Sequence, residues 1–522
     1  MSERSGGEAR AGGVAARETN SSLAALPPRS WPSVTGLVAC LLLTGCMVGP
    51  DFRQPEPPIA SRYTETPLPQ ETVAVPGIGG EVQHLLPGRD LPAQWWTLFH
   101  SEALDTLIRQ AINDSPNLAA AEATLRVARE NLAAQQGALL YPQANLNAGA
   151  TREKFSAASI GVPSEGSTLF NLYNASVNVS YMFDLFGGNH RELEALQSLV
   201  DYQRYQLEGA YLSLTSNIVT TAVNEATLRA EIRATQEIIA AEQKQLRLVE
   251  RQYELGGVAR LAVTLLRTQL DQTRATLPPL ERNLSLARHQ LAVLCGRLPS
   301  EAALPEFNLD ELVLPQDLPI SLPSQLARQR PDIRASEALL HQASAQVGVA
   351  TADLYPKINL SGAFGWESTQ VSSFFGPPVW SLAASLLQPL FNGGELEANR
   401  RASIAAYDQA QAQYRQTVLV AFQNVADSLR ALESDATTLS AQADAELSAR
   451  ETLDLTQHQY QLGGASSLAL LIAQQQYQLA RLALAAAQGT RYADTAALFQ
   501  ALGGGWWQRQ DQAAPPVQGK AD

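Results

Sequence analysis

An internal duplication constrains the fold of this 522-residue chain more than any other feature of its sequence. Four short motifs of the first half recur in the second half, in the same order and at offsets of about 205 to 215 residues. Chance does not explain four ordered matches, so we expect two copies of one unit, joined by a linker that holds several prolines. The pairs are Ser115–Leu118 with Arg330–Ile333, Tyr141–Leu146 with Tyr355–Leu360, Leu185–Gly188 with Leu390–Gly394, and Gln252–Gly257 with Gln459–Gly464.

Each copy contains two stretches in which apolar residues alternate with small polar residues. Val177, Val179 and Tyr181 follow this pattern, and the second copy repeats it after Tyr355 and around Trp380. The alternation predicts four strands of about ten residues, each with one apolar face and one polar face. Such faces fit a lipid-facing exterior and a water-facing lumen, although a soluble sandwich with one wet face has the same pattern.

Four strands are too few to close a barrel in a membrane. Bacterial membrane barrels have at least eight strands, and lipid does not tolerate strand edges whose backbone groups lack partners. If the strands lie in a membrane, the chain therefore has to oligomerise.

Most of the remaining sequence in each copy is predicted to be helical. Apolar residues step by three and four from about His190 to Leu255, and Val418–Leu432 repeats these steps, as in the seam of a coiled coil. Some 65 residues at about 1.5 Å each predict a helix on the order of 100 Å long.

Glycines and prolines mark where these helices are expected to end. Gly256-Gly257 and Gly463-Gly464 end the long helices, and a second helical pattern returns from each of these turns. Proline lacks the backbone donor and clashes with the preceding turn. We therefore expect Pro278-Pro279 to interrupt the first returning helix, and Pro116 and Pro331 to break the opening helix of each copy.

The N-terminus has the pattern of a lipoprotein signal peptide. Four arginines precede a short apolar run, Leu37–Leu43, which is much too short to span a bilayer. The run is followed by Thr-Gly-Cys46, and Leu-Thr-Gly-Cys46 resembles the bacterial lipobox; a buried hairpin or a disordered leader with an incidental cysteine is the alternative. The resemblance implies cleavage before Cys46 and attachment of a diacylglycerol and an N-acyl chain, which together anchor a protein firmly. Met47 at the next position favours sorting to the outer membrane.

Composition and motifs argue against other classes of protein. The net charge of −13 excludes charge-driven binding to nucleic acid. No nucleophile elbow, phosphate loop or spacing of metal ligands among the six histidines indicates an enzyme, so we expect no catalytic residue, no metal and no cofactor beyond the acyl groups. Cys295 stands alone in an apolar stretch, which favours packing over reactivity. A coiled-coil scaffold without a pore leaves the four strands unexplained.

Several motifs together resemble the TolC superfamily, in particular the outer membrane efflux lipoproteins that serve resistance-nodulation-division pumps. The resemblance implies a homotrimer: an α+β membrane protein whose twelve-stranded outer-membrane β-barrel, with four strands per chain, continues into a long periplasmic α-helical barrel. It also implies a channel that passively conducts substrates from an inner-membrane pump and a periplasmic adaptor; the outer membrane duct of a type I protein-secretion system is the alternative. The motifs are the lipobox, Cys46–Phe52, Trp95–Phe99, the duplicated Tyr-Pro and Leu-Gly-Gly pairs, Leu277–Glu281 and Ala501–Trp507.

The same resemblance implies that the tips of the two helical hairpins face the adaptor and form the gate. Relatives carry aspartates after these turns, but this chain has Ala262 in the first hairpin and Ala469 and Ile472 in the second, so an acidic ring is not expected at these positions. Arg260 either contacts the adaptor or is simply solvated. The predicted tip residues are Gly256, Gly257, Arg260, Gly463, Gly464 and Ser466.

The predicted organisation divides the chain into six segments. They are a signal peptide (1–45), an acylated, extended N-terminal segment (46–100), a first repeat of helix, two strands and long helical hairpin (101–298), a Pro-rich linker (299–322), a second such repeat (323–502) and a C-terminal tail (503–522). The sequence does not identify the exported substrate.

Overall fold

The computed structural model describes residues 47–156, 167–301 and 303–509. These residues all belong to the second of two compact units, Met1–Cys46 and Met47–Asp522. The predicted signal peptide, Cys46 and the last part of the predicted tail lie outside the described residues.

The duplicated sequence folds into two matching sets of helices. The first set comprises α2 (Glu102–Asp114), α3 (Pro116–Leu140), α4 (Gly188–Glu254) and α5 (Arg260–Leu294), and the second comprises α6 (Pro323–Gln329), α7 (Pro331–Ala352), α8 (Glu395–Gln461) and α9 (Ser467–Ala501). The long helices α4 and α8 have 67 residues each, and the returning helices α5 and α9 have 35 each. At 1.5 Å per residue α4 and α8 are about 100 Å long, as predicted.

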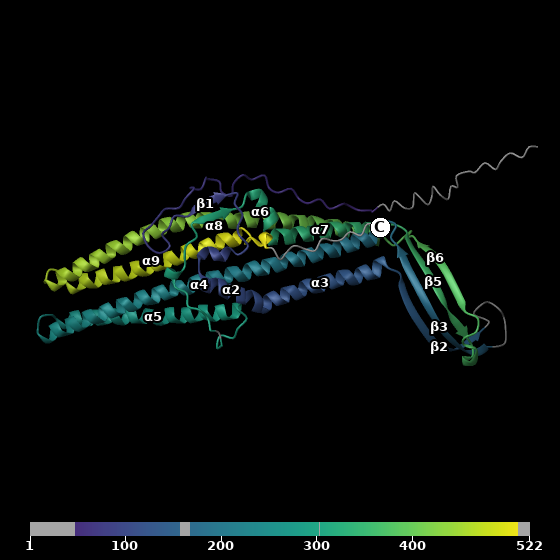
Figure 1. Cartoon of the computed structure of the whole chain (residues 1–522), viewed down its shortest axis with the longest axis horizontal. Coiled ribbons are helices and arrows are strands. Elements are labelled where there is room, and N and C mark those ends of the chain that lie inside the picture. Colours follow the sequence, from purple (N-terminus) through teal and green to yellow (C-terminus); the bar gives the residue numbers. More distant parts are fainter. Residues whose placement is uncertain (1–46, 157–166, 302, 510–522) are drawn as a thin grey trace, which may run out of the picture. The chain divides into compact units, whose positions relative to one another are not determined.

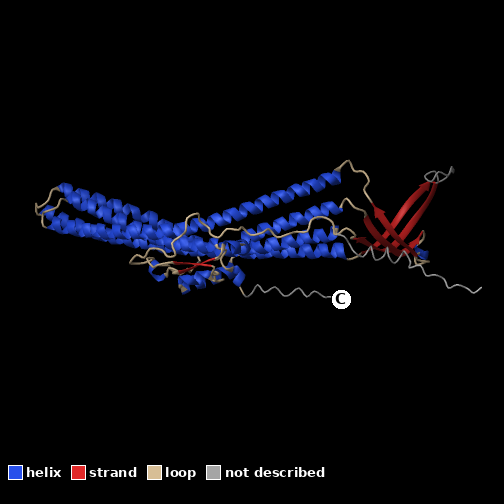
Figure 2. Ribbon diagram, turned by 90° about the horizontal axis from the view of Figure 1, so that it is seen from above, coloured by secondary structure: helices blue, strands red, loops and turns tan. Residues whose placement is uncertain are grey.

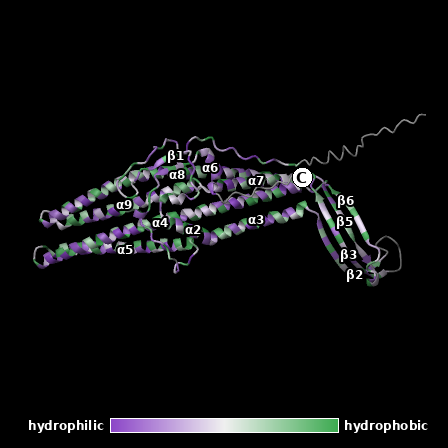
Figure 3. Ribbon diagram, in the orientation of Figure 1, coloured by the Kyte–Doolittle hydropathy of each residue, from purple (hydrophilic) through white to green (hydrophobic). Residues whose placement is uncertain are grey.

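Hydrophilic and hydrophobic residues are interleaved along all of these helices (Figure 3). This is the pattern of helices that pack against one another along one stripe and meet water along another. Within the described residues, no helix combines the length and hydropathy needed to cross a bilayer.

Four antiparallel strands form one sheet in the order β2-β3-β5-β6. Their bounds are β2 Gln143–Ser156, β3 Ser167–Phe183, β5 Lys357–Ser368 and β6 Val379–Leu387, so the first hairpin is longer than the predicted ten residues per strand. Strands from the two copies meet where β3 pairs with β5. The sheet adjoins the ends of α3 and α7 (Figure 1), and Figure 2 shows it apart from the helices.

The prolines act differently in the two places where breaks are predicted. Pro116 and Pro331 are the first residues of α3 and α7, where a missing N–H costs nothing, and the breaks are confirmed. The predicted interruption at Pro278-Pro279 is wrong, because α5 runs through both residues. Both prolines are exposed, so the carbonyl groups that lose helical partners lie near water.

Two segments that the sequence analysis treats as extended chain and linker form part of the main core. Short strands β1 (His84–Pro87) and β4 (Asp317–Ile320) pair in parallel, and neither is predicted. Trp95, Trp96 and Phe99 of the 3-10 helix η1 (Trp95–Phe99) pack in the same core as apolar residues of 304–320, α4 and α9. Three other short helices are η3 (Leu309–Glu311), η4 (Val371–Ser373) and η5 (Trp506–Gln508). The segment between the repeats is therefore bound to the helices rather than free.

Candidate functional site

One face of the four-stranded sheet is continuously apolar. The register aligns apolar residues of all four strands in single rows: Leu146, Val177, Phe364 and Trp380 form one row, and Ala144, Val179, Gly362 and Leu382 the next. Leu382 is 82% exposed and Trp380 74% exposed within one chain. A contiguous apolar face of this kind marks a surface that meets lipid or another protein.

The opposite face carries amides, hydroxyls and small residues in the rows that lie behind the apolar ones. Asn145, Asn178, Ala363 and Ser381 form one such row, and Gln143, Ser180, Ser361 and Ala383 form another. The predicted separation into an apolar and a polar face is confirmed. Both outer strands of the sheet, β2 and β6, have one edge without a partner strand among the described residues.

The apolar face has the height of a membrane barrel's outer band. On β3 it runs from Phe183 to Tyr173, ten residue steps, or about 33 Å along the strand. With the usual strand tilt of about 40°, this corresponds to a band of about 25 Å, the height found in outer-membrane barrels.

The predicted tip residues lie in two turns of the same geometry. Gly256 and Gly463 have left-handed φ values of 75° and 77°. The N–H groups of Gly257 and Gly464 each donate to the carbonyl five residues earlier, Gln252 and Gln459, at 2.8 Å. This is the helix-ending motif that favours glycine, so the predicted ends of the long helices are confirmed.

The residues after these turns differ between the hairpins. Ser466 caps α9, because its hydroxyl accepts a hydrogen bond from the N–H of Ala469 at 3.2 Å, whereas Arg260 begins α5 and is exposed. Ala262 is buried, and Ile472 is 50% exposed. Four leucines project at the tips and are more than half exposed: Leu255, Leu261, Leu462 and Leu468. The roles predicted for the tip residues stay predictions.

Between the tips and the core, a buried polar layer joins the two hairpins. Thr273 of α5 donates to Glu242 of α4 at 3.1 Å and to Gln478 of α9 at 3.3 Å, and Gln475 donates to Gln269 at 2.8 Å. Burial raises the pKa of Glu242. The layer was not predicted, because each of its members looks like an ordinary helical polar residue in the sequence.

At the other end of the helices, Arg191 and Glu194 of α4 together with His341 and Gly348 of α7 form a notch that holds the residues that follow Cys46. The Arg191 side chain is 3% exposed and pairs with Asp51 at 2.6 Å and with Glu194 at 2.7 Å. His341 binds the same Glu194 at 2.8 Å, and the ring of Phe52 stacks on His341 with centroids 4.2 Å apart. The segment from Met47 to Phe52 is therefore fixed to α4 and α7.

Glycines allow this close approach. A Cβ atom on Gly49 would lie 2.4 Å from the Cα of Gly348, and a Cβ on Gly187 would lie 2.5 Å from the side chain of Met47. The Cys46–Phe52 motif is recognisable in the sequence, so a signal for the notch is present, although the motif alone does not indicate a structural role.

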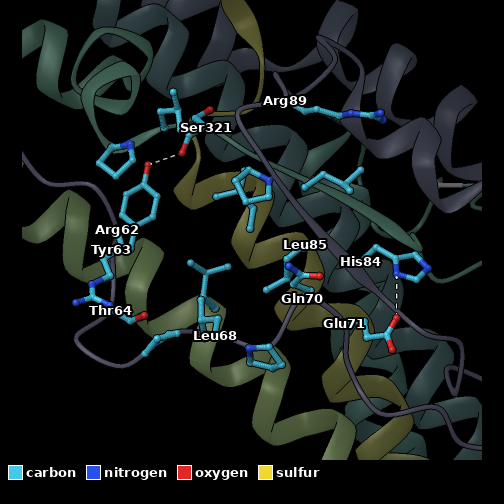
Figure 4. A pocket seen from close by; sticks show the side chains of 18 of the residues that line it. Arg62, Tyr63, Thr64, Leu68, Gln70, Glu71, His84, Leu85, Arg89 and Ser321 are labelled. Atoms are coloured by element: carbon cyan, nitrogen blue, oxygen red, sulfur yellow. Dashed lines mark hydrogen bonds and ion pairs between the residues drawn. The ribbon is translucent and has the colours of Figure 1, made fainter.

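A pocket of about 630 Å³ lies beneath the N-terminal segment, beside β1 and β4. Figure 4 shows Tyr63, Leu68 and Leu85 lining it, with the Tyr63 hydroxyl donating to the Ser321 carbonyl at 2.8 Å. His84 and Glu71 lie 3.6 Å apart at its edge. No convergent set of catalytic groups faces this pocket among its lining residues.

A buried arginine fastens the N-terminal segment to α9. Arg491 is fully buried and donates to Thr72 Oγ1 at 2.8 Å and to the Glu81 carbonyl at 2.7 Å. Nearby, burial, together with a hydrogen bond that the protonated carboxyl donates to Asp494, raises the pKa of Asp435 to about 7. Two carboxyl groups in contact share a proton more readily than they both ionise.

The described residues hold no cluster of three or more histidine, cysteine or acidic side chains that could bind a metal. Cys295 is buried in the main core, and burial raises its thiol pKa to about 11. A thiol with such a pKa is a poor nucleophile, which supports a packing role.

Comparisons with known proteins agree with this architecture. A model of the outer membrane efflux protein family matches residues 107–297 and 322–504, one match in each repeat. The chain is 31% identical over 488 residues to the pyoverdine export outer membrane protein OpmQ of Pseudomonas aeruginosa, covering 91% of this chain and 98% of that protein. It is 28% identical over 482 residues to the toluene efflux pump outer membrane protein TtgC of Pseudomonas putida, covering 91% and 96%.

A solved structure shares the fold. The outer-membrane channel OprN superposes with a TM-score of 0.79 at 27% identity, covering 88% of this chain and all of that one. The predicted resemblance is thereby confirmed, and the relatives are channel proteins rather than enzymes. The chain belongs to the outer membrane efflux protein family and is an outer membrane channel of an efflux system.

Proposed function

We propose that three copies of this chain close a twelve-stranded barrel in the outer membrane and continue it as a helical tube into the periplasm. The observation that carries the proposal is a sheet with one apolar face, one polar face and two unpaired edges. Lipid does not tolerate such edges, and joining β6 of one copy to β2 of the next removes all of them. Three sheets of four strands supply a closed barrel with a polar interior.

The tube conducts passively from its helical end to its barrel end. An inner-membrane resistance-nodulation-division pump and a periplasmic adaptor deliver the substrate, and the adaptor binds the hairpin tips. The exposed leucines at the two turns give such a partner apolar contacts, and Arg260 gives it a charged one. The two relatives are named for pyoverdine and toluene, two unlike compounds, which fits a duct whose partner pump selects the substrate.

The chain is anchored through acyl groups on Cys46, which lies outside the described residues. The notch supports this proposal, because it fixes Met47–Phe52 at the end of the helices that adjoins the sheet. Replacement by Cys46→Ser tests it: palmitate labelling is expected to vanish, and continued labelling of that variant contradicts acylation at this residue.

Disulfide trapping across the sheet edges tests the trimer. Asn147 on β2 and Ser381 on β6 both lie on the polar face. A chain with Asn147→Cys and Ser381→Cys is expected to oxidise in membranes to covalent dimers and trimers.

The control for this experiment is a pair within one chain. Asn147→Cys with Ser176→Cys joins directly opposed residues of β2 and β3, so it is expected to close without linking chains. Further cysteine pairs between β2 and β6, shifted along the strands, cover other registers of the edge. If the control oxidises while all of these edge pairs give only monomers, the closed barrel is contradicted.

Accumulation in cells tests conduction. Loss of the protein is expected to raise the intracellular level of the pump's substrate, in a strain without a redundant duct. An unchanged level there contradicts export by this chain.

A further inference from the structure

The first hairpin of the sheet extends beyond the second hairpin, and its outer face changes there from apolar to charged. β3 pairs with β5 only from Tyr173 onward, so Thr151–Ser156 and Ser167–Leu172 form a two-stranded ribbon above the four-stranded part. The pairing of β2 with β3 is continuous and contains no bulge. The alternation of faces therefore carries through from the apolar band into the ribbon.

This continuity places two cations on the lipid-facing side. Arg152 and Lys154 follow Leu146, Ala148 and Ala150 on the same face of β2, opposite Asn171 and Leu169 of β3. Both side chains are exposed.

The outward side of the ribbon carries no compensating negative charge. Glu153, between the two cations in sequence, points to the other face, where it lies opposite Phe170. No ion pair joins Arg152 or Lys154 to a carboxylate in the described ranges. The strand β6, which the proposed trimer brings against β2, contains no charged residue.

The height of the two cations matches the headgroup layer. Arg152 lies two residues beyond Ala150 and Lys154 four, or about 5 and 10 Å above the apolar band along the membrane normal for a strand tilted by about 40°. Tyr173 and Trp366 lie in the top two rows of that band, as aromatic residues do at a membrane interface. Because helices continue the sheet at its opposite end, the ribbon faces outward from the cell.

We propose that Arg152 and Lys154 bind the phosphate groups of phosphorylated lipids in the outer leaflet. The proposal rests on the membrane orientation of the proposed function. Arg152 supplies a planar donor fork that suits phosphate oxygens, Lys154 supplies a compact charge, and Asn171 adds a neutral donor beside Arg152. Each trimer carries three such sites, spaced around the barrel where neighbouring sheets meet.

Lipid binding to the purified full-length protein in a neutral detergent tests this inference. The probes are lipid A with both phosphates and the same lipid after dephosphorylation, with bound lipid counted by native mass spectrometry. Arg152→Gln with Lys154→Gln is expected to weaken binding of the phosphorylated lipid by roughly 25-fold, about fivefold per cation. Binding of the dephosphorylated lipid is expected to stay unchanged.

The matched control removes two cations elsewhere. Arg126→Gln with Arg129→Gln takes two exposed charges from α3, far along the chain from the ribbon, and is expected to bind both lipids like the unmodified protein. Equal binding of phosphorylated lipid by the ribbon variant and the unmodified protein overturns the inference. So does displacement of that lipid by millimolar inorganic phosphate, which indicates a site for free anions instead.

The ribbon variant also separates this inference from the proposed duct. It is expected to form trimers and to restore export, because neither cation lies on the polar face of the sheet. A ribbon variant that loses lipid binding and keeps export supports the inference. If the unmodified protein forms no trimers at all, the proposed duct itself is refuted.

Discussion

Replacing Asp435 by asparagine is expected to remove a pH dependence from the stability of the helical hairpin α8–α9. The Asp435 carboxyl is partly buried against Asp494, and its pKa is raised from 3.8 to about 7, first by burial and then by the hydrogen bond that it donates to Asp494 and by the charge of Asp494. The folded chain therefore holds a proton between pH 4 and 7 that the unfolded chain has released. Stability from this group is complete below about pH 4 and is lost as the pH rises to about 7.

The magnitude follows from the pKa difference. A difference of about three units at 1.36 kcal/mol each gives an upper bound of about 4 kcal/mol. Because the carboxyl keeps some contact with solvent and shares its proton with Asp494, we expect about half of this, or about 2 kcal/mol. Asparagine has nearly the same shape and stays neutral, so it is expected to match the original below about pH 4, to exceed its stability by less than about 1 kcal/mol at pH 5, and to exceed it by about 2 kcal/mol at pH 8.

Denaturant unfolding of the detergent-solubilised protein, followed by tryptophan fluorescence between pH 5 and 8, measures this difference. Comparing variants at each pH cancels the titration of all other groups. Asp454→Asn, an exposed position on the same helix, is the control and is expected to show a pH-independent difference. If Asp435→Asn and the original protein differ equally at pH 5 and pH 8, the raised pKa is wrong.

Two further substitutions probe the sheet and the notch. Leu382→Arg puts a charge in the middle of the apolar face and is expected to cost about 2 to 4 kcal/mol, seen as loss of heat-resistant trimers on gels, while Ser381→Arg on the polar face is tolerated. Arg191→Met removes the partner of Asp51 and one of the two partners of Glu194, at a cost of about 1 to 3 kcal/mol, so trypsin is expected to cleave after Arg53 faster in membranes. Arg400→Met removes a more exposed pair with Glu397, and an equal acceleration there means that the notch does not hold the segment.

The elements that the sequence predicts well are those with a local repeating pattern. The steps of three and four in α4 and α8 extend over 67 residues, and the two copies support each other, so even the glycine turns are placed correctly. The strands are predicted for the same reason, since alternation decides which face each residue takes.

The elements that were missed depend on contacts between distant parts of the chain. β1 and β4 have four residues each, contain Pro87 and Pro319, and pair across more than 200 residues, so neither shows a pattern alone. Arg191 reads as a surface arginine until Asp51, 140 residues away, is placed beside it. A Pro-Pro pair is expected to break a helix that is buried. The sequence does not show that α5 exposes the rings of Pro278 and Pro279 to water, where the helix continues through them.

The two glycine turns have the same backbone geometry but are followed by different side chains, and this difference affects how a symmetric partner can bind the tips. In the proposed trimer the duplication supplies six tips, and Arg260 follows three of them while Ser466 follows the other three. A partner built of six identical subunits that docked on this proposed trimer would meet two non-equivalent sites. A single substitution at one turn would then change only three of the six contacts.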